Sequence, residues 1–263
     1  MRAEADEAPL QAPAVELRGV GQLYRSRDGV LRALDAVSIT IREGEFLVIV
    51  GPSGCGKTTL LKMVAGLIRP TEGEVRIGGR PVTGPVPGIG MVFQNPVLLR
   101  WRTVLGNVLL PVEILRLDRG HYEAAARETL RLVGLEGFEN RRPSELSGGM
   151  QQRAALARAL VHDPTLLLMD EPFGALDQLT REQMNLELLR IWGARRITTL
   201  LITHSVQEAV LLGDRVVVMT PRPGRVAEVV EIDLPRPRTA EMQFTAGFAS
   251  LAEQIAVRIR LGG

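Results

Sequence analysis

The sequence predicts an α/β fold with a mostly parallel core sheet, an antiparallel β subdomain and an inserted helical subdomain. Short apolar runs recur at Glu45–Val50, Leu166–Met169, Thr199–Ile202 and Val216–Met219, as in strands that are buried on both faces of a sheet. A helical pattern over Leu179–Trp192 separates two of these runs. Strand, helix and strand at this spacing favour parallel strands joined by right-handed crossovers.

The remaining elements of the first hundred residues follow from alternation and turn residues. Val15–Ile41 alternates and contains a turn signal at Arg27-Asp28-Gly29, which predicts a few antiparallel strands. A helix is predicted over Lys57–Leu67 and a short strand over Glu74–Ile77. The segment Gly79–Gly90 is rich in Gly and Pro and is predicted to be loop.

A mostly helical region spans residues 96–162, with Tyr122–Val133 its clearest segment. Because it interrupts the predicted sheet, we expect it to form an inserted subdomain. We also expect a disordered tail over residues 1–14, one domain over 15–235 and a helical C-terminal tail over 236–263. The sequence leaves open whether this last tail packs on the core or regulates it.

Composition excludes several classes of protein. The formal net charge of +2 is no electrostatic footprint for nucleic acid. Cys55 is the one cysteine, so an intrachain disulfide is impossible and a reducing compartment is expected. The acidic, Ala/Pro-rich N-terminus does not resemble a signal peptide, and no stretch approaches the roughly 20 apolar residues of a membrane span. A membrane role would therefore require another chain.

A phosphate-binding loop is predicted at Gly51-Pro-Ser-Gly-Cys-Gly-Lys57-Thr58, between a strand and a helix. Glycines let several backbone N–H groups point inward, and the helix N-terminus adds its positive dipole. Lys57 supplies a cation for the β- and γ-phosphates, and Thr58 a hydroxyl ligand for Mg²⁺. A chance match would leave a Gly-rich turn, which the flanking strand and helix disfavour. Within the loop, Cys55 is either a small structural residue or a reactive thiol.

Two carboxylates and a histidine follow later strands. Asp170 and Glu171 end the apolar run Leu166–Met169; alternation sends their side chains to opposite sides, so Asp170 suits the Mg²⁺ shell and Glu171 a general base. His204 follows the run Thr199–Ile202. Alone, these residues would be a solvated pair and a structural histidine. Parallel strands, however, deliver them to the same sheet edge as Lys57.

A second anion site is predicted at Leu146-Ser147-Gly148-Gly149-Met150, where a serine and two glycines open a helix. A plain helix cap has the same composition. The segment resembles the signature motif of ABC ATPases, and the chain is identified as a member of the ABC transporter ATP-binding subunits over Val15–Pro235. This resemblance implies the P-loop NTPase fold.

The resemblance implies specific roles. Nucleotide contacts would come from Tyr24, Gly51, Pro52, Ser53, Gly54, Cys55, Gly56, Lys57, Thr58, Thr59, Gln94, Ser147, Gly148 and Gly149. Mg²⁺ ligands would be Thr58, Gln94 and Asp170, and the catalytic residues would be Glu171, His204 and Lys57. Tyr24 would stack on adenine, Gln94 would be the Q-loop glutamine, and Gly174–Asp177 the D-loop that is read across a dimer.

The implied protein is an ATPase that couples hydrolysis of Mg-ATP to solute import. It would form a homodimer with nucleotide between its protomers and dock on two integral membrane permease subunits, with a solute-binding protein as an indirect partner. Its place would be the cytoplasmic face of the bacterial inner membrane, as a peripheral subunit. Met150, Gly174 and the run Pro221-Arg-Pro-Gly-Arg225 are typical of the nitrate, sulfonate and taurine importers, whereas Arg100 departs from that group.

The alternatives are non-transport ABC ATPases and a non-catalytic regulator. Those acting on DNA carry long coiled coils, and no sustained heptads or basic stripe are present here. Translation factors of this family carry two cassettes, and this chain has one. The retained Lys57, Asp170, Glu171 and His204 disfavour the regulator.

Overall fold

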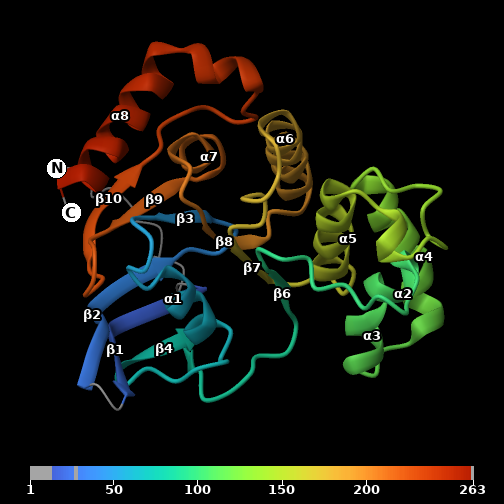
Figure 1. The fold of residues 1–263 in the computed structure, drawn as a ribbon, viewed down its shortest axis with the longest axis horizontal. Coiled ribbons are helices and arrows are strands. Elements are labelled where there is room, and N and C mark those ends of the chain that lie inside the picture. Colours follow the sequence, from blue (N-terminus) through green and yellow to red (C-terminus); the bar gives the residue numbers. More distant parts are fainter. Residues whose placement is uncertain (1–13, 27–28, 262–263) are drawn as a thin grey trace, which may run out of the picture.

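The structure is a computed structural model that describes residues 14–26 and 29–261. Within these ranges the strands form a four-stranded sheet, in the order β2-β1-β4-β5, and a six-stranded sheet, in the order β10-β9-β3-β8-β7-β6 (Figure 1). The turn predicted at Arg27-Asp28 lies outside the described residues, as does the predicted tail apart from Ala14.

The smaller sheet is antiparallel, as the alternation predicted. It contains β1 (Val15–Ser26), β2 (Gly29–Ile41), β4 (Glu72–Ile77) and β5 (Arg80–Pro81). Strand β1 lies in the middle and pairs with both β2 and β4. The sheet covers one face of the larger one, with the helix α1 (Lys57–Val64) between them.

The larger sheet is parallel except for one edge strand. Its strands are β3 (Phe46–Val50), β6 (Ile89–Val92), β7 (Leu166–Asp170), β8 (Thr198–Ile202), β9 (Arg215–Met219) and β10 (Val226–Glu231). Only β10 runs antiparallel to its neighbour, β9. The α/β fold predicted from the four apolar runs is confirmed.

The prediction of a loop over Gly79–Gly90 is wrong at both ends, because β5 lies inside it and β6 begins within it. Strand β6 reads Ile-Gly-Met-Val and lacks the unbroken apolar run of a central strand. A Cβ on Gly90 would lie 2.5 Å from the backbone oxygen of Ala159, so the glycine is needed for a helix to approach the strand. Gly90 is therefore present in β6 because of close packing, although a glycine at this position favours a loop when only the sequence is considered.

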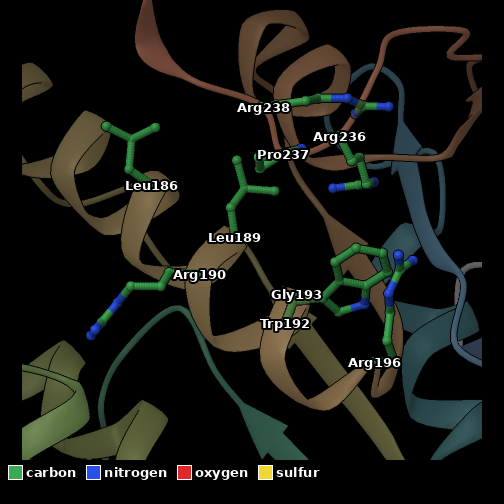
Figure 2. Close-up of a pocket in the computed structure, with 9 residues that line it drawn as sticks. All are labelled: Leu186, Leu189, Arg190, Trp192, Gly193, Arg196, Arg236, Pro237 and Arg238. Atoms are coloured by element: carbon green, nitrogen blue, oxygen red, sulfur yellow. The ribbon is translucent and has the colours of Figure 1, made fainter.

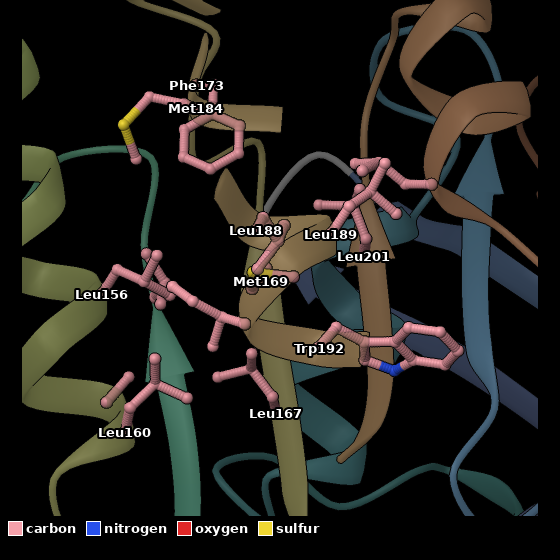
Figure 3. Packing of buried hydrophobic residues seen from close by; sticks show 14 of the residues in the cluster. Leu156, Leu160, Leu167, Met169, Phe173, Met184, Leu188, Leu189, Trp192 and Leu201 are labelled. Atoms are coloured by element: carbon pink, nitrogen blue, oxygen red, sulfur yellow. The ribbon is translucent and has the colours of Figure 1, made fainter. Parts of the chain in front are cut away.

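Alternate residues of the central strands face two different cores. Leu47 and Ile49 of β3 pack toward α1 and the antiparallel sheet, whereas Phe46, Val48 and Val50 pack into the core on the other face. Figure 3 shows the second core, where side chains from β7 meet those of two helices, α5 (Gly148–Leu160) and α6 (Gln178–Arg195). A sheet buried on both faces holds its strand ends rigidly.

The helical region lies to one side of the core sheet, beyond the edge strand β6 (Figure 1). It comprises α2 (Val104–Val108), α3 (Leu110–Ile114), α4 (Arg119–Leu132), the 3-10 helix η1 (Pro143–Glu145) and α5. Helix α4 corresponds to the segment predicted over Tyr122–Val133. Helix α5 packs on β6 and so joins this layer to the sheet.

The C-terminal segment packs on the core, which answers the question that the sequence left open. It contains the 3-10 helix η2 (Ala240–Phe244) and the helix α8 (Ala246–Leu261). Phe248 and Ile255 of α8 are buried in the same core as β9 and the helix α7 (Val206–Leu212). The strand β10 that leads to this segment was not predicted, because only its Val230 is fully buried.

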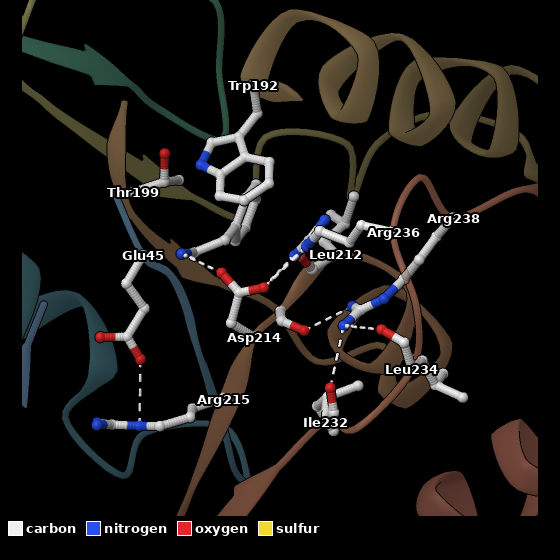
Figure 4. A network of polar contacts seen from close by, with 12 residues as sticks. Glu45, Trp192, Thr199, Leu212, Asp214, Arg215, Ile232, Leu234, Arg236 and Arg238 are labelled. Atoms are coloured by element: carbon white, nitrogen blue, oxygen red, sulfur yellow. Dashed lines mark hydrogen bonds and ion pairs between the residues drawn. The ribbon is translucent and has the colours of Figure 1, made fainter. Parts of the chain in front are cut away.

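Arginines fasten the start of this segment to the core (Figure 4). Arg236 Nε donates to Asp214 Oδ1 at 2.8 Å, and the backbone N–H of Phe46 donates to Asp214 Oδ2 at 2.9 Å. The guanidinium of Arg236 also lies 4.2 Å from the centroid of the Trp192 ring. A cavity of about 490 Å³ lies beside these side chains, between α6 and the segment that carries Arg236 (Figure 2).

Arg238 caps the C-terminal end of α7. Its Nη1 donates to the backbone oxygens of Val210, Leu211 and Gly213 at 3.0, 3.1 and 2.6 Å. Its Nη2 donates to the oxygens of Ile232 and Leu234 at 3.2 and 3.4 Å. Burial lowers the pKa of Arg238 to about 10, so the side chain remains charged near neutrality, and the positive charge complements the helix dipole.

We expect Arg238→Ala to lower the free energy of unfolding by about 3 kcal/mol, because several buried backbone oxygens would lose their donor. Urea denaturation followed by circular dichroism measures this change. Arg260→Ala, which removes an exposed arginine from α8, is the control and should change stability by less than about 0.5 kcal/mol. Equal unfolding free energies for the two variants would contradict the capping role.

Candidate active site

The candidate site lies where β3, β7 and β8 end. Asp170 is the last residue of β7, and Lys57 and His204 follow the carboxyl ends of the neighbouring parallel strands β3 and β8. A cavity of about 400 Å³ opens there. It is lined by Tyr24, Leu31, Ala33, Ser53, Gly54, Gly56, Lys57, Thr58, Thr59, Glu171 and Arg222. The sheet edge therefore gathers most of the predicted residues, as open α/β sheets do at their ligand sites.

The loop between β3 and α1 encloses the ammonium of Lys57. Its Nζ donates to the backbone oxygens of Gly51 and Pro52 at 2.8 and 3.0 Å, and the side chain is buried. Cys55 is also buried, with Sγ 3.9 Å from Lys57 Nζ, which fits a small structural residue rather than an exposed reactive thiol. The loop is thus a curled backbone around a buried cation, which is suited to phosphate.

Thr58 and Asp170 form the second feature of the cavity. Thr58 Oγ1 donates to Asp170 Oδ1 at 3.1 Å. Burial raises the pKa of Asp170, although the bond from Thr58 opposes this shift. A hydroxyl and a carboxylate oxygen this close fit Mg²⁺, which binds few protein oxygens and takes its other ligands from phosphate and water. In residues 14–26 and 29–261 no cluster of three or more His, Cys, Asp or Glu side chains is placed to hold a metal.

Glu171 and His204 form a pair. Glu171 Oε2 lies 3.3 Å from His204 Nδ1, within hydrogen-bond distance. Strand β7 ends at Asp170, and Glu171 has a φ of +44°, in the left-handed region. The direction of the Glu171 side chain is therefore set by a strained turn and not by the strand alternation that we predicted. Such strain in a residue other than glycine is concentrated at functional sites.

A largely buried hydrogen-bond network holds the loop that carries His204. Thr203 Oγ1 donates to Glu208 Oε2 at 2.5 Å and accepts from the N–H of Ser205 at 3.0 Å. Arg181 Nε lies 3.9 Å from Glu208 Oε1, and Arg181 Nη2 donates to the oxygen of Leu176 at 2.8 Å. The segment Gly174–Asp177 and the loop of His204 are thus braced together. Sequence analysis missed this network; its signal is a glutamate within the buried run of α7.

Tyr24 lines the cavity. The residue is 42% exposed, and its hydroxyl lies 3.4 Å from Thr59 Oγ1. The hydroxyl is held while the ring retains an exposed surface, as a stacking role requires. Leu31, Ala33 and Arg222 also line the cavity and were missed.

Several predicted residues are outside the lining of this cavity; of these, Asp170 and His204 contact its lining residues Thr58 and Glu171. Gln94 is exposed in the segment after β6, and Ser147, Gly148 and Gly149 lie at the start of α5. Ser147 Oγ accepts from the N–H of Met150 at 3.3 Å and caps the helix. The two anion sites predicted in the sequence, the loop before Lys57 and the helix start at Ser147, are therefore separate within one chain.

The helix α5 links the Ser147 motif to the segment around Gln94. Gln152 Nε2 donates to the oxygen of Phe93 at 3.1 Å. Arg158 donates to the oxygens of Val97 and Pro96, both at 2.8 Å. The helix capped by Ser147 thus contacts the chain on both sides of Gln94. A displacement of the Ser147 end of α5 would therefore also displace the segment of Gln94.

Met150 and Gly174 both fit the structure. The side chain of Met150 packs against the apolar core, which any long apolar side chain satisfies. A Cβ on Gly174 would lie 3.5 to 3.7 Å from the backbone oxygen and Oε2 of Glu171 and from Cε1 of His204. These are ordinary contacts, so the glycine leaves space beside the Glu171–His204 pair without being required sterically.

Comparisons with known proteins decide the family. A family model described as ABC transporter matches residues 34–174, more than half of the chain. The chain belongs to the ABC transporter family. As an ATP-binding subunit of this family it binds and hydrolyses ATP, and the resemblance of the sequence motifs is confirmed.

Three relatives show how far the likeness of this ABC subunit extends. An uncharacterized ABC transporter ATP-binding protein of Methanocaldococcus jannaschii is 49% identical over 85% of this chain and 84% of its own length. A taurine import ATP-binding protein of Burkholderia pseudomallei is 49% identical over 82% and 84%. A dimeric ATP-binding cassette, solved in a post-hydrolysis state with ADP and Pi, is 34% identical, with a TM-score of 0.74 over 84% of this chain and all of its own.

Across the described helices of this ABC subunit, from α1 to α8, no apolar stretch reaches the length needed to cross a bilayer.

We expect Lys57→Ala to weaken ATP binding at least tenfold, because the phosphates would lose a buried, preorganised cation. Isothermal titration calorimetry with ATP measures the affinity. Lys62→Ala is the matched control, since Lys62 lies in the same helix with an exposed side chain and lines no part of the cavity. Unchanged affinity in Lys57→Ala would refute the placement of the phosphates.

Proposed function

We propose that two copies of this chain clamp ATP between them and drive uptake of a solute of the nitrate, sulfonate and taurine class through separate permease subunits. The observation that carries the proposal is the separation of two anion-binding helix starts in one chain. The loop before Lys57 lines the cavity, and Ser147 faces solvent elsewhere. A second copy supplies the missing half of each site.

The start of α5 is built to receive a ligand from outside the chain. Ser147 and Gly148 are exposed, and a Cβ on Gly148 would meet no atom within 4 Å. Gly149 is more confined, since a Cβ on it would lie 3.1 Å from Thr180 Cγ2 of α6. This open helix N-terminus suits the γ-phosphate held by a partner. The dimeric relative solved with ADP and Pi supports the arrangement.

The residues of one chain would divide the chemistry of hydrolysis. Glu171 orients the attacking water and takes its proton, and His204, 3.3 Å away, holds the carboxylate and stabilises the charge near the γ-phosphate. Lys57 neutralises charge on the β- and γ-phosphate oxygens. The phosphorus–oxygen bond to ADP breaks as water attacks in line, giving ADP and phosphate.

Mg²⁺ would be held by Thr58 and Asp170, with Gln94 joining when the segment after β6 moves inward. The cation neutralises phosphate charge when bound. Gln94 is exposed in this chain, so this role requires the closed dimer. The segment from 96 to 162 would move as a helical subdomain within a catalytic domain over 15–235.

An apolar groove beside Gln94 is the proposed permease contact. It has a volume of about 450 Å³ and lies between β6 and the helices α3 and α5. Val97 and Ile114, which line it, are 61% and 69% exposed. Exposed apolar patches of this kind mark protein interfaces. Docking there places the chain on the cytoplasmic face of the inner membrane, beneath a permease that takes solute from a binding protein.

The Burkholderia relative is a taurine import ATP-binding protein, and its 49% sequence identity over most of both chains supports the solute class proposed here. The non-transport alternative is disfavoured by the described elements, in which the longest helix, α6, has 18 residues. A DNA-maintenance ATPase would need a coiled coil that is several times longer.

Glu171→Gln should bind ATP but lose hydrolysis by at least about a hundredfold, because the amide cannot take the proton from water. The experiment reconstitutes the chain with its permease in liposomes and measures phosphate release and taurine uptake together. Both should fall in the variant and be present in the wild type. If Glu171→Gln hydrolyses ATP at the wild-type rate, the assignment of Glu171 as the base is wrong. If the wild-type chain hydrolyses ATP without taurine uptake, the importer assignment is wrong.

Ser147→Arg should prevent ATP-driven dimerisation while each chain still binds ATP. The long cationic side chain would fill the space that a partner's phosphate enters. Sedimentation of the variant combined with Glu171→Gln, with and without ATP, gives the oligomeric state. Ser144→Arg, at an exposed position just before the motif, is the control that should still dimerise. A dimer of the Ser147→Arg variant would disprove the shared site.

A further inference from the structure

The loop between β9 and β10 lies against the phosphate loop, although the two are far apart in sequence. The backbone N–H of Gly224 donates to the oxygen of Ala33 at 2.9 Å, and the N–H of Asp35 donates to the oxygen of Gly224 at 3.0 Å. A Cβ on Gly224 would lie 1.9 Å from the oxygen of Cys55. Only glycine permits this approach, so the loop sits directly on the backbone that would wrap the phosphates.

This loop is rigid without any contribution from Arg222. Thr220 Oγ1 donates to the oxygens of Pro221 and Pro223 and accepts from the N–H of Arg225 at 3.0 Å. Arg225 Nε donates to Asp35 Oδ2 at 2.9 Å and ties the loop to β2. The backbone that carries Arg222 is therefore fixed before any ligand arrives.

Arg222 itself is exposed and lines the same cavity as Lys57 and Tyr24. In the described part of the chain its one hydrogen bond is a long one, from Nε to the oxygen of Gly54 at 3.3 Å. Four of its five N–H donors are left for a ligand. Lys57 and Arg222 are the cations of the cavity lining, and Glu171 is its acid.

We propose that Arg222 binds the phosphate chain of the nucleotide within the same protomer, as a second cation beside Lys57. A guanidinium matches phosphate oxygens in a bidentate geometry, and its rigid support lowers the entropy lost on binding. The proposal deepens the site proposed above and rests on it. It gives a role to the run Pro221-Arg-Pro-Gly-Arg225. Gly224 allows the loop to pack on the phosphate loop, and Arg222 contacts the phosphates.

The test measures ATP and ADP affinity by calorimetry in a Ser147→Arg background, where contact with a second copy is blocked. Arg222→Ala should weaken both affinities by about fivefold or more, and Arg222→Lys should recover part of the loss. Arg127→Ala, which removes an exposed arginine from α4, controls for the change in net charge. The melting temperature without nucleotide should be the same in all of these variants.

Each outcome bears on a separate claim. Unchanged affinities in Arg222→Ala, with Lys57→Ala still losing binding, overturn this inference and leave the site intact. Unchanged binding in Lys57→Ala overturns the site itself. A loss seen only where Ser147 is retained would mean that Arg222 contacts the second copy, which also overturns the inference. A lower melting temperature in Arg222→Ala would assign it a structural role instead.

Discussion

The ammonium of Lys57 is the charge around which this molecule is arranged. It is buried, and its partners are two carbonyl oxygens of the loop that encloses it. No carboxylate in the described residues lies within ion-pair distance of it. A cation removed from water and satisfied only by dipoles is electrostatically incomplete. The folded chain therefore maintains a positive, preformed site whose best complement is a polyanion.

The core sheet makes this arrangement possible. Its central strands are buried on both faces, so their ends are fixed while the loops beyond them vary. Three adjacent strand ends carry Lys57, the neighbours Asp170 and Glu171, and His204. The helix α5 packs on the edge strand β6 and contacts both sides of Gln94 through Gln152 and Arg158. One helix thus joins the core sheet to the exposed surface around Gln94.

The sequence predicted the residues whose chemistry is local to a motif. Lys57, Asp170 and His204 each follow an apolar strand, so strand recognition alone brought them to one edge. Contacts between distant segments could not be predicted. Arg222 reaches a loop 168 residues away, and Arg238 caps a helix more than 25 residues earlier. Strand β6 was missed for a similar reason, since Gly90 serves the packing of α5 rather than the strand.

The cap on α7 has a mechanical consequence. The helix is seven residues long; Ser205, next to His204, caps its start, and Arg238 grips the carbonyls at its end. The segment that follows β10 is therefore connected, through one short helix capped at both ends, to the loop that carries His204.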